Sequence, residues 1–116
     1  MKQVLVVDDV AEVRVVLRTV IEEPGVEVIE AEDGEEALRQ LSLQNIDLVV
    51  TDCKMPKMSG LELMQAARQA DPDLRFIVVS STASKEDFEH LAPHAIMSKP
   101  FRLTELRDAV NSALDQ

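Results

Sequence analysis

The sequence predicts an α/β fold with a doubly wound parallel sheet, and three observations carry this prediction. Short apolar runs rich in valine recur along the 116 residues. Between them lie segments whose apolar residues are spaced three and four positions apart, as on one face of a helix. The connections are short, and strands that alternate with helices are typical of a parallel sheet covered on both faces. No repeat, low-complexity tract or linker interrupts the pattern, so we predict one domain over residues 1–116.

The first strand is predicted at 3–7, where an apolar run ends in Asp8 and Asp9. A helix follows over 10–21, with Asp9 placed to cap its start and Pro24-Gly25 placed to end it. A second strand, 26–31, alternates apolar residues with Glu27 and Glu30, which suggests partial exposure at a sheet edge. The apolar face of the helix is predicted to carry Val10, Val13, Leu17, Val20 and Ile21.

After a turn at Asp33-Gly34, residues 35–42 are predicted as a short helix, and 46–51 as a central strand buried on both faces. A loop over 55–60 precedes a helix at 61–70. A fourth strand is expected at 76–79, a short helix at 85–91, a fifth strand at 95–97 and a last helix at 103–114. The side chains predicted to face the core are Ala37, Leu38 and Leu41, then Leu61, Met64 and Ala67, and finally Leu103, Leu106, Val110 and Leu114.

Composition and net charge argue against several classes of function. Hydrophobic residues make up 46% and charged residues 29%, an ordinary globular balance. The net charge of −10 argues against nucleic-acid binding, which calls for a basic surface. No apolar run is long enough to span a membrane, and the start does not resemble a signal peptide, so a cytoplasmic protein is expected. The single cysteine, Cys53, cannot form an internal disulfide, and we expect it to fill the core.

Polar residues follow each predicted strand, and those of the second strand, Glu32 and Asp33, are expected to lie off to the side. In a parallel sheet the carboxyl ends share one edge, where ligands bind. Three carboxylates cannot gather there uncompensated, because two unit charges about 4 Å apart repel by roughly 4 kcal/mol at an effective dielectric of about 20. A raised pKa or a bound cation would relieve this repulsion, and a few carboxylates with room for water suit Mg²⁺. The residues at this edge are Asp8, Asp9, Asp52, Ser80 and Lys99.

Four motifs, each at a strand end and in the same order, resemble the receiver domain of bacterial two-component response regulators (CheY-like). They are Val6-Val7-Asp8-Asp9, Asp52 followed by Met55-Pro56-Lys57-Met58-Ser59-Gly60, Val79-Ser80-Ser81, and Lys99-Pro100-Phe101. The resemblance covers essentially the whole chain. It implies the flavodoxin-like strand order 2-1-3-4-5 with five helices, and a cis Lys99–Pro100 bond.

The resemblance also implies roles for individual residues. Asp52 would accept a phosphoryl group from a histidine kinase, a phosphotransfer protein or a small phosphodonor. Asp9, Asp52 and the backbone carbonyl of Lys54 would bind Mg²⁺, with Asp8 acting mostly through a water molecule. Lys99 would pair with the phosphoryl oxygens. Ser80 would hydrogen-bond the phosphoryl group, helped by the backbone N–H of Ser81.

Plainer interpretations stand beside these. The Asp8-Asp9 pair could serve only to cap the following helix, although capping explains one of the two acids and not both. Lys99 could be a solvated lysine. If the register is one residue off, Ser81 takes the hydroxyl role. His90 and His94, which lack a partner motif, are interpreted as solvated side chains and not as zinc ligands.

The sequence departs from the family in two places. Ile96 stands where many members carry Tyr or Phe, an aromatic that moves inward with the hydroxyl. The segment 82–97 is shorter than usual, on a face that many members use for a target or a phosphorylation-dependent dimer. Output through a downstream protein target or a fused effector domain is implied.

Three rival functions remain. The first is an interaction module on the same fold that does not depend on phosphorylation, which would have no need of the full acidic set. The second is a Mg²⁺-dependent phosphatase with an aspartyl intermediate. Such enzymes usually carry a second acid two residues after the nucleophile, and that residue here is Lys54. The third, a flavin or dinucleotide protein, lacks the Gly-rich loop after the first strand. We therefore expect a signalling switch and not a conventional multiple-turnover enzyme.

Overall fold

The computed structural model describes residues 1–80 and 91–115. Five parallel strands form one sheet in the order β2-β1-β3-β4-β5, which confirms the implied topology. The strands are β1 (Lys2–Val7), β2 (Val26–Ala31), β3 (Leu48–Asp52), β4 (Arg75–Ser80) and β5 (Ala95–Ser98). As expected from its alternating pattern, β2 lies at one edge of the sheet, and β3 lies at the centre.

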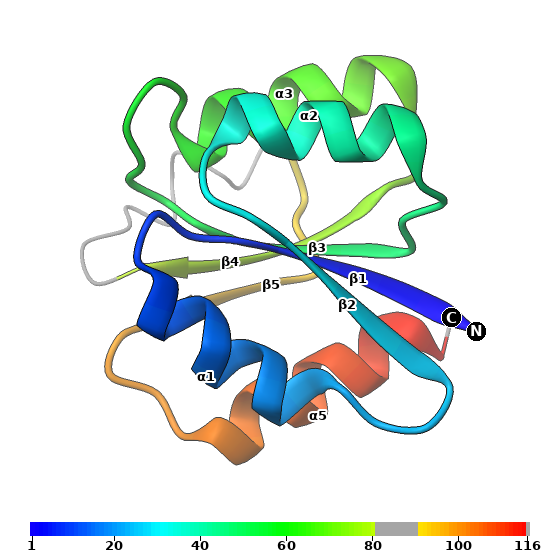
Figure 1. Ribbon diagram of the computed structural model, residues 1–116, viewed down its shortest axis with the longest axis vertical. Helices are drawn as coiled ribbons and strands as arrows, with labels where there is room; N and C mark the ends of the chain where they lie inside the picture. Colours follow the sequence, from blue (N-terminus) through cyan, green and yellow to red (C-terminus); the bar gives the residue numbers. More distant parts are fainter. Residues whose placement is uncertain (81–90, 116) are drawn as a thin grey trace.

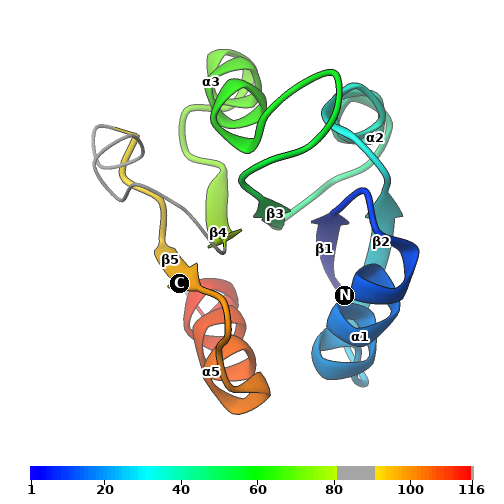
Figure 2. The same ribbon diagram turned by 90° about the vertical axis from the view of Figure 1, so that its left-hand side faces the viewer.

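Helices cover both faces of the sheet (Figures 1 and 2). Helices α1 (Ala11–Ile21) and α5 (Leu103–Leu114) lie on one face, and α2 (Gly34–Leu43) and α3 (Gly60–Ala70) lie on the other. The described residues therefore contain four of the five expected helices. The fifth, expected at 85–91, falls outside the described residues except for Leu91, which lies in a turn. No helix in the described part of the chain is long and apolar enough to cross a membrane.

The sheet divides the core into two clusters. Val4 and Val6 of β1 face α1 and α5, whereas Leu5 and Val7 face α2 and α3. This alternation follows from the two-residue period of a strand. All four side chains are fully buried, so β1 is apolar on both sides, as its unbroken apolar run predicts.

Two predicted core positions were wrong, and five more are only half-buried, namely Val13, Val20, Leu38, Leu41 and Leu61. Val10 and Leu103 are 44% and 48% exposed, because each lies at or before the first residue of its helix, where no second turn packs over it. In α3, Leu63 is fully buried while Leu61 is only half-buried. Several spacings of three and four fit this helix, and the sequence does not specify which of them faces the sheet.

Candidate functional site

The acids predicted at the carboxyl edge do converge. Val7 of β1 pairs with Thr51 of β3, so Asp8 and Asp52 leave adjacent strands at the same level. One carboxylate oxygen from each of Asp8, Asp9 and Asp52 lies within 4.8 Å of the others. Their exposure is graded: Asp8 is buried, the side chain of Asp52 is 17% exposed, and Asp9 is exposed. The cluster therefore has a buried floor and an open side.

Two of the three carboxylates are fixed by backbone amides. The Val10 N–H donates to Asp8 Oδ1, and the Cys53 N–H donates to Asp52 Oδ1, both at 2.8 Å. The prediction that Asp9 caps α1 was wrong. Val10 is the N-cap residue, and its side chain makes no capping hydrogen bond. The carboxylate of Asp9 is therefore not used to satisfy the helix start.

Lys99 supplies the positive charge at this edge. Its Nζ lies 3.9 Å from Asp52 Oδ1 and 4.0 Å from Asp8 Oδ2. Its own N–H donates to the carbonyl of Ser80 at 2.8 Å, which ties the end of β5 to the end of β4. The Lys99–Pro100 peptide bond is cis, as the resemblance implies.

Ser80 is buried at the end of β4. Asp52 pairs with Val79 across the sheet, and Ser80 pairs with Ser98. Ser80 therefore stands one residue beyond the level of Asp52, on the strand between Asp52 and Lys99. The neighbouring position predicted to help, Ser81, falls outside the described residues.

The loop after Asp52 is held against α2 and against the strand itself. Lys57 has a positive φ of 69° and lies 3.6 Å from Asp33 Oδ2, at the start of α2. The Gly60 N–H donates to the carbonyl of Cys53 at 2.8 Å. A Cβ atom on Gly60 would lie 2.3 Å from the Asp52 carbonyl oxygen, so only glycine permits this approach. The loop presents Lys54 as an exposed residue beside the acids.

The electrostatics of the cluster favour a bound cation. Burial raises the pKa of Asp8 above its ordinary value, and the nearby charges of Asp52 and Asp9 raise it further. The Val10 amide and Lys99 oppose this rise. One lysine cannot balance three carboxylates, and oxygen ligands of this kind suit a hard divalent ion. The donor set present therefore fits Mg²⁺.

A second set of charges, which was not predicted from the sequence, lies behind the acids. Arg14 of α1 donates to the Asp8 carbonyl at 2.6 Å and to Glu30 Oε1 at 3.1 Å. Arg14 lies between apolar residues in the helical pattern of α1. Nothing in the sequence indicated that its side chain reaches back to the Asp8 carbonyl at the end of β1.

The remaining predicted residues lie away from this edge or beside it. Cys53 is half-buried and packs against the core beneath α2 and α3, as expected. His94 is half-buried, with Nε2 3.2 Å from Ser112 Oγ, and His90 falls outside the described residues. Its contact with Ser112 shows that His94 is not simply solvated.

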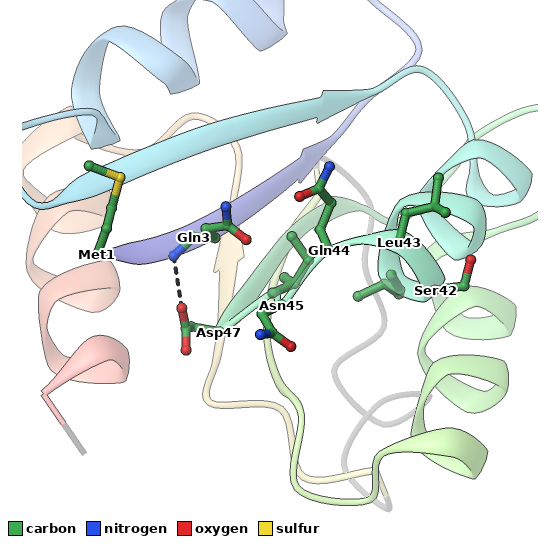
Figure 3. A pocket seen from close by; sticks show the side chains of 9 residues that line it. Met1, Gln3, Ser42, Leu43, Gln44, Asn45 and Asp47 are labelled. Carbon is green, nitrogen blue, oxygen red and sulfur yellow. Dashed lines mark hydrogen bonds between the residues drawn. The ribbon is translucent and has the colours of Figure 1, made fainter.

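A hollow of about 830 Å³ lies at the opposite, amino-terminal edge of the sheet (Figure 3). There the Gln3 N–H donates to Asp47 Oδ2 at 2.8 Å, and Leu43 and Met1 are exposed. Uncharged side chains such as Gln44 and Asn45 make up most of its lining. The ionisable groups that could perform chemistry therefore gather at the carboxyl edge and not in this hollow.

The fold and this edge together define an α/β protein with a doubly wound parallel sheet, three clustered acids and a lysine at the carboxyl ends of its strands. The family model "Response regulator receiver domain" matches residues 4–111. The chain belongs to the response regulator receiver domain family of two-component signalling.

Curated relatives fall into two length classes. The alkaline phosphatase synthesis transcriptional regulatory protein PhoP of Bacillus subtilis is 36% identical over 97% of this chain but over only 48% of its own length. The chain therefore spans about half of that relative. The chemotaxis protein CheY of Thermotoga maritima is 33% identical over 95% of each chain, so it is similar in length as well as in sequence.

Solved structures agree with the fold. The response regulator protein TrrA of Thermotoga maritima, determined in complex with Mg(2+)-BeF, is 36% identical with a TM-score of 0.89 over 98% of this chain and 100% of that chain. A CheY-like receiver domain protein from Methanospirillum hungatei is 28% identical with a TM-score of 0.92 over 99% of this chain and 94% of that chain.

Proposed function

We propose that this receiver domain is a phosphorylatable switch in which Asp52 accepts one phosphoryl group. One observation carries the proposal: three carboxylate oxygens lie within 4.8 Å of one another, with the Lys99 ammonium 3.9 Å from Asp52. Such a cluster costs free energy through burial and repulsion. A reaction that uses both the negative and the positive charges explains why the groups are held together.

Asp52 is the acid best placed to react. Asp8 is buried, and Asp9 is exposed at the rim. Asp52 is partly exposed and rigidly placed by the Cys53 amide. A carboxylate oxygen of Asp52 forms a bond to phosphorus, and the bond from phosphorus to a histidine nitrogen of the donor breaks. The nitrogen keeps the electron pair and takes a proton from solvent.

Lys99 and the acids have complementary tasks in this reaction. Lys99 neutralises part of the negative charge on the phosphoryl oxygens, which would otherwise repel the attacking carboxylate. Asp8, Asp9 and Asp52, with the backbone carbonyl of Lys54, would hold Mg²⁺. When bound, the ion supplies further charge neutralisation and orients the phosphoryl oxygens.

Phosphorylation would then be read at the surface. The product adds a charge of about −1.5 to −2 and new acceptor oxygens at the end of β3. Ser80, on the adjacent strand, can donate its hydroxyl to them, and such a local event can bias a two-state surface. We propose a sensor histidine kinase or phosphotransfer protein as donor and a downstream protein or effector domain as the reader. The domain takes one phosphoryl group and is not a multiple-turnover enzyme.

Incubation with acetyl phosphate and Mg²⁺ tests the proposal. Intact-mass spectrometry should show one phosphoryl adduct on the wild-type chain and none on Asp52→Asn. Omitting Mg²⁺ should abolish the adduct. A wild-type chain that never gains the adduct, while remaining folded, would favour the phosphorylation-independent interaction module. Sustained turnover of a generic phosphomonoester would favour a phosphatase.

A further inference from the structure

The short turn from Asp8 to Val10 carries two of the three clustered acids. It links β1 to α1 and must hold both carboxylates toward Asp52. Two hydrogen bonds fix it: the Val10 N–H to Asp8 Oδ1 at 2.8 Å, and Arg14 Nη1 to the Asp8 carbonyl at 2.6 Å. The N-cap residue Val10 makes no side-chain capping bond, and the Arg14 side chain reaches back from α1 to this turn.

Arg14 is itself held in place by β2. Its Nε donates to Glu30 Oε1 at 3.1 Å, and its side chain is 16% exposed. The other oxygen of Glu30 accepts from Arg18 Nη1 at 2.7 Å. A planar guanidinium with donors on two sides can bridge a carboxylate and a carbonyl at once, which an ammonium does less well. The position of Arg14 is therefore determined from the strand on one side and from the acidic turn on the other.

We propose that Arg14 is a positioning residue for Asp8 and Asp9, which acts through the Asp8 carbonyl and touches neither the cation nor the phosphoryl group. This inference rests on the proposed function, because it assigns Arg14 to the cation affinity of that site. Loss of the arginine lets the turn relax, and the two carboxylates then spend less time in the arrangement that the cation needs. Groups that orient ligands from behind commonly change metal affinity by about 10–100-fold.

The direction of the effect separates positioning from simple charge. Arg14 is a cation close to an anionic cluster, so its removal alone should strengthen the binding of Mg²⁺ through Coulomb's law. A positioning role predicts the opposite: weaker binding although a positive charge has been removed.

Arg18 provides a matched control on the same helix. It shares Glu30 with Arg14 and donates to the Val28 carbonyl at 3.0 Å, but it has no hydrogen bond to the acidic turn in the described part of the chain. Arg18→Met thus removes the same charge and the same carboxylate partner. It leaves the Asp8 carbonyl contact in place.

The test is calorimetric titration of Mg²⁺ into the full chain after removal of metals with chelator. Arg14→Met should weaken Mg²⁺ binding about tenfold, whereas Arg18→Met should leave it within about twofold of wild type. Arg14→Lys, which keeps the charge and serves if Arg14→Met is poorly folded, should also weaken binding. Backbone NMR should show altered Asp8 and Asp9 amide shifts in Arg14→Met before any Mg²⁺ is added.

The outcomes are distinguishable. Equal Mg²⁺ affinity in Arg14→Met and Arg18→Met, or tighter binding in Arg14→Met, would overturn the positioning role. Because the titration requires no phosphodonor, the role can stand or fall whether or not Asp52 gains an adduct. Under saturating Mg²⁺, adduct formation on Arg14→Met should recover toward the wild-type rate; a deficit that saturation leaves untouched would also count against it.

Discussion

Two aspartates that precede helices in this chain are used in different ways. Asp33 Oδ1 accepts the Glu36 N–H at 2.8 Å and so caps α2. Asp9 precedes α1, yet Val10 occupies the cap position and Asp8 accepts the Val10 amide. A shift of one residue in the helix start thus decides whether a carboxylate stabilises the backbone or remains available for a ligand.

Asp33 should give the protein a measurable dependence of stability on acidic pH. Its pKa lies below the ordinary value, mainly because of the Glu36 amide and secondarily because of Lys57, despite some burial. Where the folded state holds its proton less tightly than the unfolded state, stability rises with pH. The contribution is therefore complete above the unfolded value of about 3.9 and is lost as pH falls through the lower folded value.

The measurement is urea unfolding between neutral and acidic pH. Asp33→Ala should lower the free energy of unfolding by about 1 kcal/mol at neutral pH through loss of the cap. Asp33→Asn, which can still cap, should lose less and should flatten the acidic pH dependence. If Asp33→Asn follows the wild-type pH profile throughout, the charge of Asp33 does not contribute.

At the scale of elements, the sequence predicted which strand residues are buried better than which face of each helix is buried. An unbroken valine-rich run such as that of β1 is buried on both faces, so its position does not depend on orientation. The burial of a helix residue also depends on how the helix is rotated about its axis. The spacing in α3 is compatible with a buried Leu61 as well as with a buried Leu63. The carboxyl ends of the strands were correctly predicted to collect the acids, because parallel pairing brings those ends together. The contact of Arg14 with the Asp8 carbonyl depends on a side-chain path that no spacing encodes.

The start of α3 should tolerate substitution less well than the start of α2. Gly60 and Gly34 are each the first residue of a helix. A Cβ on Gly60 would meet the Asp52 carbonyl oxygen at 2.3 Å, whereas a Cβ on Gly34 would meet the Met58 side chain at 2.7 Å. The atom that a Cβ on Gly34 would meet at 2.7 Å is Met58 Cβ, which no rotamer change moves, so the contact is relieved only by a shift of the loop between β3 and α3. A surface loop shifts more easily than backbone at the end of a central strand.

Gly60→Ala should therefore lower the free energy of unfolding by about 1–3 kcal/mol, and Gly34→Ala should cost less. Chemical denaturation of both variants provides the measurement. Because Gly60 packs against the backbone carbonyl of Asp52, Gly60→Ala should also slow adduct formation on the Asp52 carboxylate. Equal stability of the two variants would contradict the argument from backbone contact.

For the whole molecule, the net charge of −10 is the dominant electrostatic fact. Self-repulsion of that size opposes the compact state and is relieved by salt in general. The three clustered acids add a local repulsion that a divalent ion relieves specifically. General screening and specific binding should therefore be separable by comparing two salts.

MgCl₂ should stabilise the protein more than NaCl at the same ionic strength. At free Mg²⁺ ten times its dissociation constant, binding adds about 1.4 kcal/mol to the free energy of unfolding. Asp9→Asn should lose most of this increment while keeping the response to NaCl. Thermal or urea unfolding monitored by circular dichroism suits a chain without Trp or Tyr. Identical curves in the two salts would argue against a specific cation site.

The sheet also acts as a partition between two halves that can change separately. Val6 and Leu106 belong to the core beneath α1 and α5, whereas Val7 and Leu63 belong to the core beneath α2 and α3. Substitutions in opposite halves share no side-chain partners, so their costs should add. One outer face can therefore be remodelled for a new partner over time without repacking the other. The acids at the carboxyl end of the sheet lie in neither cluster, so substitutions that repack one half need not displace them.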